Sequence, residues 1–273
     1  NNSHDTVNTA KAYTYLGDYY VKKDVSDSAF YCYYKAEKLY LKLNDNYNIA
    51  KTQFSKASLR FNENDYFDSE ITVFKALRII KHIKANDLQY QCYNLLGILY
   101  NEREEYNKSL EFHNKALAIL DDRSIPKEFQ YKATSLNNMG YVYLNLKNYS
   151  QAKKYFEEGL KQENLFAEKP SLYAMLLDNL AYTKFKLRDK KDLPDLFYKA
   201  LKIRDSVNLT SGVIINKTRL SEYYAFQNDT LKAIQYAKQA LAISRSTNRL
   251  RSILETLKQM GAKKKKNASK YSK

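Results

Sequence analysis

Asparagines that precede a small residue recur along the chain, and their side chains are suited to holding a peptide. A carboxamide both donates and accepts hydrogen bonds, so a row of such groups can bind the backbone of an extended chain. Aromatic and apolar side chains one helical turn away would contact the side chains of that peptide. The alternative interpretation gives the same asparagines a structural role. The candidate binding residues are Asn94, Ile98, Asn137, Asn138, Tyr141, Asp178, Asn179, Tyr182 and Arg219.

Catalytic and metal chemistry has no comparable support in the sequence. The three histidines, His4, His82 and His113, are far apart and do not have the spacing of metal ligands. We expect His113 to be a packed core residue. With only 6 glycines, the chain has no room for a glycine-rich phosphate loop. The sequence therefore predicts no catalytic residues, no metal site and no cofactor, and it favours a non-enzymatic protein.

The elements that position the asparagines are predicted to be helices. The chain has 273 residues, of which 6 are glycine and 3 are proline. β-Sandwiches and doubly wound α/β folds need many more of these residues at their turns. Apolar positions follow the stripe of an amphipathic helix, as at Leu96, Gly97 and Tyr100. Two cysteines are too few for a disulfide framework, so we expect Cys32 and Cys92 to be buried free thiols.

An internal repeat of about 40 residues organises the predicted helices. A small residue marks the first apolar segment of each unit, and a second small residue marks the segment that follows. The polar stretch between the two segments is long enough only for a turn, so each unit is predicted to be a helical hairpin. Small residues let the two helices approach closely. The first column is Gly17, Ala57, Gly97, Gly140, Ala181 and Ser221, and the second is Ala36, Ala76, Ala116, Gly159, Ala200 and Ala240.

The pattern within each unit resembles the tetratricopeptide repeat, most clearly in Leu96-Gly97, Tyr100, Tyr106, Ser109 and Ala116-Leu117. The resemblance implies an all-α fold, a right-handed superhelical solenoid of helical hairpins whose first helices line a concave face. The candidate residues would lie on that face. We predict a single domain over residues 1–273, with partial or capping helices at 250–273. Its six repeats cover approximately residues 10–43, 50–83, 90–123, 133–166, 174–207 and 214–247.

The positive charge of the chain is concentrated at one end. The formal net charge is +16, and residues 245–273 carry more than half of it, with a run at Lys263–Lys266. Three interpretations stay open for this run: a solvated end, a segment near an anionic membrane surface, and contact with nucleic acid. The third lacks the interleaved aromatic residues and base-reading elements that would support it, so we expect no direct nucleic-acid binding by this fragment.

Composition and chain length suggest a piece of a larger protein. Lysine greatly outnumbers arginine, asparagine and tyrosine are abundant, and the chain stops within the predicted seventh unit. These features resemble the tetratricopeptide sensor regions of Bacteroidetes-type regulators. The resemblance implies a periplasmic or otherwise extracytoplasmic array, which precedes a membrane helix and a histidine kinase or helix-turn-helix output domain. A cytoplasmic location is the alternative.

The expected function is the binding of a peptide, protein or small ligand on the concave face, as the sensory part of a bacterial signalling or transcription-regulating protein. Two other functions stay open. One is a soluble adaptor or assembly scaffold that gathers partners. The other is the repeat domain of a cytoplasmic peptide-pheromone receptor. Fold alone does not separate the three, because repeat arrays serve many partners.

Overall fold

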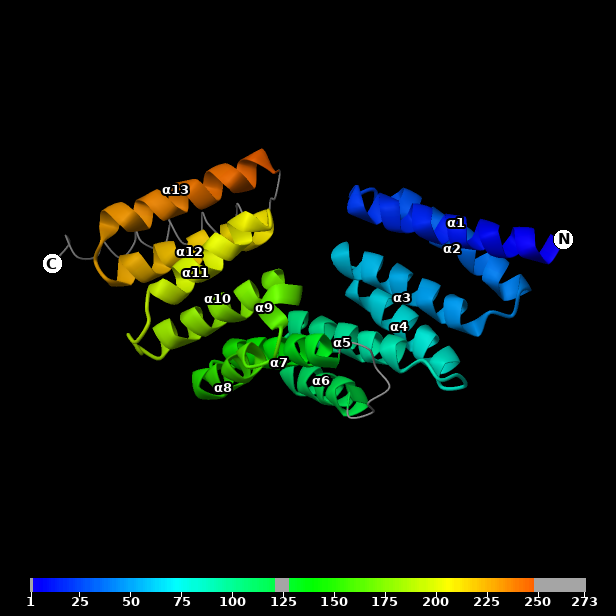
Figure 1. Ribbon diagram of the computed structural model, residues 1–273, viewed down its shortest axis with the longest axis horizontal. Helices are drawn as coiled ribbons and strands as arrows, with labels where there is room; N and C mark the ends of the chain where they lie inside the picture. The colour runs from blue at the N-terminus through cyan, green and yellow to red at the C-terminus, as the bar shows by residue number, and fades with distance from the viewer. Residues whose placement is uncertain (1, 121–127, 248–273) are drawn as a thin grey trace. The chain divides into compact units, whose positions relative to one another are not determined.

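The chain is helical throughout the part that the structure describes. The computed structural model describes residues 2–120 and 128–247, which form 13 helices and no strand. The all-α fold predicted from the sequence is thus confirmed. The chain divides into two compact units, unit 1 from Asn1 to Glu128 and unit 2 from Phe129 to Lys273. Figure 1 shows the helices of both units, coloured along the chain.

Unit 1 contains three helical hairpins. The hairpins are α1 (Asn2–Lys22) with α2 (Ser26–Lys42), α3 (Asn46–Asn62) with α4 (Tyr66–Ile80), and α5 (Asn86–Glu102) with α6 (Tyr106–Leu120). The second helix of one hairpin packs against the first helix of the next, α2 on α3 and α4 on α5. The first helices α3 and α5 are also in contact. Stacking of this kind buries a continuous apolar core that no single hairpin could form.

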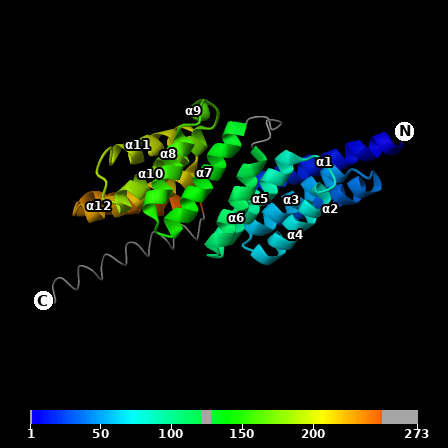
Figure 2. The same ribbon diagram turned by 90° about the horizontal axis from the view of Figure 1, so that it is seen from below.

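Unit 2 repeats the same arrangement (Figure 2). Its hairpins are α7 (Glu128–Asn145) with α8 (Tyr149–Leu160), α10 (Pro170–Lys186) with α11 (Asp195–Ser206), and α12 (Thr210–Phe226) with α13 (Thr230–Ser246). A short helix, α9 (Leu165–Glu168), connects the first hairpin to the second. Second helices again pack on the first helix of the next hairpin, α8 on α10 and α11 on α12. The first helices α10 and α12 touch each other.

In the turns within and between hairpins, residues other than glycine adopt the left-handed backbone conformation. Most of the non-glycine residues with positive φ are asparagine or aspartate, the residue types that best tolerate this conformation. After α3, Asn64 has a φ of 65°, and the N–H of Asp65 donates to the carbonyl oxygen of Arg60 at 2.9 Å. The carboxylate of Asp65 then accepts from the backbone N–H of Asp68 and caps α4. Such turns explain how 6 glycines suffice for this fold.

The first column of small residues lies where the two helices of a hairpin approach most closely. A Cβ atom on Gly97 would lie 2.5 Å from the ring of His113, and one on Gly140 would lie 2.6 Å from the ring of Phe156. The hydroxyl of Ser109 donates to the carbonyl oxygen of Gly97 at 2.6 Å and links α5 to α6. The close approach of paired helices is therefore confirmed for the first column. Gly159 of the second column instead approaches Leu176 of the next hairpin.

His113 occupies the core position that Phe156 fills in the following hairpin. Its side chain is 1 % exposed, and neither ring nitrogen has a hydrogen-bond partner among the described residues. Burial lowers the pKa of this imidazole to about 4. The prediction of a packed core histidine is confirmed. Cys32 and Cys92 are buried and unpaired, as predicted, and burial raises the pKa of the Cys92 thiol to about 12.

The predicted helices at 250–273, with the basic run Lys263–Lys266, lie outside the described residues. Within the ranges 2–120 and 128–247, no helix is both long and apolar enough to cross a bilayer. The single solenoid over residues 1–273 and the extracytoplasmic location stay predictions.

Candidate functional site

Most of the candidate binding residues lie on the first helices of the hairpins in unit 2. They lie just before or directly after the small residue of each helix. The two in unit 1, Asn94 and Ile98, lie on α5 and are half-buried. Those in unit 2 are Asn137, Asn138 and Tyr141 on α7, Asp178, Asn179 and Tyr182 on α10, and Arg219 on α12.

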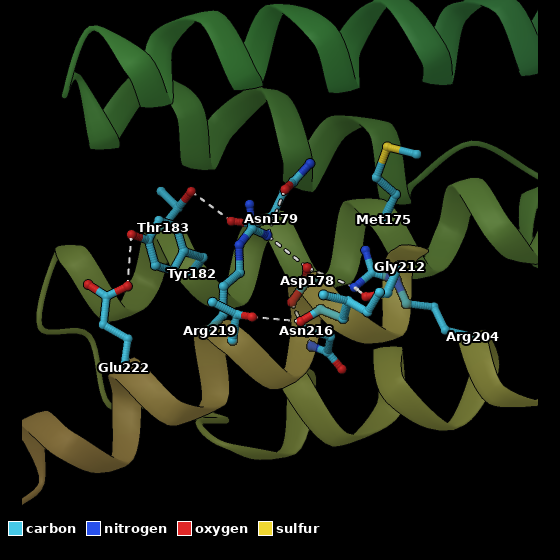
Figure 3. Close-up of polar contacts among 12 residues, drawn as sticks. Met175, Asp178, Asn179, Tyr182, Thr183, Arg204, Gly212, Asn216, Arg219 and Glu222 are labelled. Carbon is cyan, nitrogen blue, oxygen red and sulfur yellow. Dashed lines mark hydrogen bonds and ion pairs between the residues drawn. The ribbon is translucent and has the colours of Figure 1, made fainter. Parts of the chain in front are cut away.

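The carboxylate of Asp178 is the centre of the polar contacts in unit 2, as Figure 3 shows. It is completely buried, and its Oδ2 accepts from Nη1 of Arg204 at 2.9 Å and from Nη1 of Arg219 at 2.8 Å. Its Oδ1 accepts from Nδ2 of Asn216 at 2.6 Å. Arg204 also donates to the carbonyl oxygen of Gly212 at 2.8 Å. One carboxylate thus joins α10, α11 and α12.

A chain of side-chain amides connects this centre to α7. Nη1 of Arg219 donates to Oδ1 of Asn179 at 2.8 Å, and Nδ2 of Asn179 donates to Oδ1 of Asn137 at 2.9 Å. Nδ2 of Asn137 donates in turn to Oδ1 of Asn138 at 3.2 Å and lies 3.4 Å from Sδ of Met175. Asn137 and Asn179 are buried. These two amides therefore have partners within the fold and hold consecutive first helices together.

Tyr182 forms the edge of the cluster. Its hydroxyl donates to Oε2 of Glu222 at 3.1 Å, and Nζ of Lys186 donates to Oε1 of Glu222 at 2.6 Å. The guanidinium of Arg219 lies over the tyrosine ring, 4.7 Å from its centre. Burial raises the pKa of the Tyr182 hydroxyl, and the charge of Glu222 raises it further. The hydroxyl is therefore a protonated donor at neutral pH.

The electrostatics of the cluster are those of a buried ion triad. Burial lowers the pKa of the Arg204 guanidinium, whereas the attraction of Asp178 opposes this effect. A guanidinium keeps its proton in proteins even when buried. Arg204 and Arg219 therefore both remain cationic beside a single carboxylate.

Six side chains around these contacts remain partly open to solvent, and we call them the A face of unit 2. Tyr141, Met175 and Ile215 are exposed by 37 %, 38 % and 44 %, and the other three are half-buried. Chemically, this surface combines amide and guanidinium donors with aromatic and aliphatic side chains. It can bind polar and apolar groups of a peptide together. The A face consists of Asn138, Tyr141, Met175, Tyr182, Ile215 and Arg219.

Two members of the buried cluster, Arg204 and Asn216, were not among the residues expected from the sequence. Arg204 lies on a second helix, whereas all the candidates were sought on first helices. One signal was available, because the equivalent positions of the preceding hairpins in unit 1 are buried and uncharged: Tyr40, Ile80 and Leu120. An arginine at a position that is buried and uncharged throughout unit 1 needs a partner, and Asp178 is that partner.

Metal-ligating residues do not gather at this surface. Within residues 2–120 and 128–247, no group of three or more His, Cys, Asp or Glu side chains could hold a metal ion. The side chains of the A face offer hydrogen bonding, ion pairing and apolar contact.

Comparisons with known proteins give one family and several similar folds. Residues 133–164 match the tetratricopeptide repeat model. No curated protein matches the chain. The apo form of RapI has a similar structure, with a TM-score of 0.66 and 18 % identity over 89 % of this chain and 85 % of that one. RapI therefore shares the fold of the chain at low sequence identity.

Two further structures extend this comparison. The Rap conjugation gene regulator of plasmid pLS20, in complex with the Phr* peptide, has a TM-score of 0.66 and 16 % identity over 91 % of this chain and 77 % of that one. A signal transduction ATPase with numerous domains from Pyrococcus horikoshii, which has a tetratricopeptide repeat sensor, has a TM-score of 0.69 and 18 % identity. The match covers 88 % of this chain and 36 % of that one.

Proposed function

We propose that the chain binds peptides through the A face of unit 2. Residues 133–164 match the tetratricopeptide repeat model, and the described residues form helical hairpins like those of such arrays. The proposed ligand is either a free peptide or an extended segment of a partner protein. It assigns no catalytic step to the chain. The observation that carries the proposal is the A face itself. Its exposed apolar side chains surround hydrogen-bonding groups that are held in position by the buried contacts of Asp178 and Asn179.

The buried contacts give this surface its rigidity. Asn179 and Asn137 hold α10 against α7, and Asp178 holds α12 against α10. A surface that is ordered before binding loses less conformational entropy when a ligand arrives. In this account the exposed and half-buried residues contact the ligand. The buried members, Asn137, Asp178 and Asn179, position them.

Similar folds support a signalling role for such binding. One similar structure is a gene regulator in complex with a peptide, and another protein has a tetratricopeptide repeat sensor. We propose that the chain is likewise the sensory part of a regulatory protein. Attachment to a membrane and to a histidine kinase or helix-turn-helix domain stays a prediction. A binding experiment would distinguish an adaptor, because an adaptor would retain a folded partner protein in a stable complex rather than a short peptide.

A peptide selection tests the proposal directly. The purified chain is immobilised and incubated with a synthetic library of random octapeptides, and retained peptides are identified by mass spectrometry. We expect a restricted set of retained sequences that contain aromatic or aliphatic residues. Dissociation constants of those peptides are then measured by fluorescence anisotropy.

Variants of the A face locate the binding surface. Tyr141→Ala combined with Ile215→Ala removes two exposed side chains on α7 and α12, and should weaken peptide binding about tenfold or more. Leu231→Ala is the matched control, because Leu231 is an 83 % exposed apolar residue on α13. It should leave affinity unchanged. Equal affinities of the double variant and the wild type would refute the location, and retention of no peptide would refute the function.

A further inference from the structure

An open groove runs between α1 and α2, the first hairpin of unit 1. Its volume is about 310 Å³, and among its lining residues Leu16 is exposed by 40 % and Tyr31 by 55 %. This hairpin exposes eight large apolar side chains, whereas the described helices α5 and α6 expose none. A concentration of exposed apolar side chains marks a surface that binds a partner.

The third hairpin, α5 with α6, shows what covers the equivalent groove there. Helix α4 packs on α5, and the ring of Phe74 on α4 lies 6.3 Å from the ring of Phe112 on α6. Leu96 of α5 packs in the same apolar cluster and is completely buried. Leu96 and Leu16 both directly precede the glycine of the first small column. The exposure of Leu16 is therefore that of a position which a neighbouring helix covers elsewhere in unit 1.

A carboxylate on the same face of α4 accompanies this aromatic ring. Glu70 lies one turn before Phe74, and its Oε1 accepts from the hydroxyl of Tyr100. Its Oε2 accepts from Nη1 of Arg103 at 2.6 Å. The helix that covers α5 thus presents a glutamate and an aromatic residue at positions i and i+4, which share one helix face.

The first hairpin repeats the residues that receive α4 in the third. Counted from the glycine of each first helix, Tyr13, Leu16, Tyr20 and Lys23 correspond to Tyr93, Leu96, Tyr100 and Arg103. The second hairpin has Gln53, Lys56, Arg60 and Glu63 at these places, so the pattern is not general to the repeat. The first hairpin is therefore suited to a helix with the chemistry of α4.

Two other lining residues agree with this interpretation. Cys32 occupies the position of Phe112, and the smaller side chain leaves room for an incoming aromatic ring. Asp27 also lines the groove. A second carboxylate is compatible with such a contact, because Glu105 lies 2.7 Å from Nη2 of Arg103 while Arg103 also binds the glutamate of α4.

We propose that the groove of the first hairpin binds an amphipathic helix of a partner protein. A glutamate of that helix contacts Tyr20 and Lys23, and an aromatic residue four positions later lies between Leu16 and Tyr31. A second copy of the chain offers no free helix of this kind. Among the described second helices, α4 alone has the glutamate and aromatic pair at these positions, and it is already packed on α5.

A synthetic peptide with the sequence of residues 65–82, which include α4, tests the proposal. It carries a fluorophore and is added to the full chain, in which α4 already covers α5. Fluorescence anisotropy gives the dissociation constant. We expect saturable binding that is weakened at least about tenfold by Glu70→Gln in the peptide, and at least about tenfold by Phe74→Ala.

Variants of the protein locate the peptide. Leu16→Ala combined with Tyr31→Ala should weaken binding at least about tenfold, because both side chains line the groove. Leu41→Ala is the matched control, since Leu41 is 54 % exposed on α2 and does not line the groove. Lys23→Gln should weaken the unmodified peptide but leave the Glu70→Gln form nearly unchanged. Circular dichroism checks that each variant is folded.

Each contrary outcome overturns the proposal. Absence of binding, or equal affinities of the three peptides, would show that the groove does not recognise the glutamate and aromatic pair. Binding that survives the double variant would place the peptide elsewhere, for example on α5 in exchange for α4. A dimer in sedimentation velocity that the double variant abolishes would assign the groove to a second copy. The octapeptide selection tests the A face of unit 2 separately.

Discussion

Asp178 and Arg204 form a buried ion pair between α10 and α11, with Oδ2 and Nη1 2.9 Å apart and side chains exposed by 0 % and 3 %. The same carboxylate oxygen also receives Arg219 from α12. One acidic residue therefore holds three helices of unit 2 and two cations. Stability and binding are coupled at this point, because the residue that packs the helices also orients the guanidinium of the A face.

Removal of this carboxylate should strongly destabilise the protein. Asp178→Ala leaves two guanidinium groups without their partner in a place that water barely reaches. We expect a loss of about 3–5 kcal/mol in the free energy of unfolding, measured by urea denaturation. Asp205→Ala, at an exposed position of α11, is the control and should change stability by less than about 0.5 kcal/mol. Similar losses in both variants would contradict the role given to Asp178.

Stability should depend on the ionisation of His113. Its pKa falls from 6.5 to about 4 in the fold, because burial disfavours the cation. Between these values the unfolded chain binds a proton that the folded chain does not, so stability decreases as the pH falls from 6.5 towards 4. The decrease due to this residue is about 3 kcal/mol.

Urea denaturation at several pH values isolates this effect. His113→Phe should remove it, since Phe156 fills the equivalent position of the next hairpin. His82→Phe should retain it, because His82 is exposed. The prediction is wrong if the wild type and His113→Phe lose stability in parallel on acidification.

The close approach of α7 and α8 predicts coupling between Gly140 and Phe156. In a helix, Gly→Ala normally stabilises by up to about 1 kcal/mol. At Gly140 the new Cβ would lie 2.6 Å from the ring of Phe156, so we expect a net loss of about 1–3 kcal/mol instead. In the background Phe156→Ala, the same substitution should cost much less. Additive losses in this double-mutant cycle would contradict direct contact.

The left-handed turn residues predict a stabilising substitution. Lys147 follows α7 with a φ of 60°, a conformation that is unfavourable for a side chain but not for glycine. Lys147→Gly should therefore raise the free energy of unfolding by up to about 1 kcal/mol. Lys154→Gly, in the interior of α8, should lower it by about 1 kcal/mol. Losses in both variants would argue against the turn conformation.

The hairpin architecture could be predicted from the sequence because its determinants are local and repeated. Columns such as Gly97 and Gly140 mark where paired helices touch, and the structure confirms the contact with His113 and Phe156. The free, buried state of Cys32 and Cys92 was expected because two cysteines are too few for a disulfide framework. These features depend on one hairpin at a time.

The burial of the candidate residues could not be predicted in the same way. Sequence register places Asn137 and Asn179 on neighbouring first helices, but it does not show how closely those helices pack. In the structure the two amides satisfy each other at 2.9 Å. The partners of Asp178 depend on α11 and α12 together, and Arg204 lies on a second helix that the register argument did not consider. The periodicity of the sequence does not predict the contacts between successive hairpins.

Hydrogen–deuterium exchange with a selected octapeptide tests the central claim most directly. Exchange of backbone amides is compared with and without saturating peptide, and protected segments are located by mass spectrometry. We predict that protection on binding is concentrated in α7, α10 and α12, which carry the A face of unit 2. Protection confined to α8, α11 and α13, or to unit 1, would contradict the proposed binding surface.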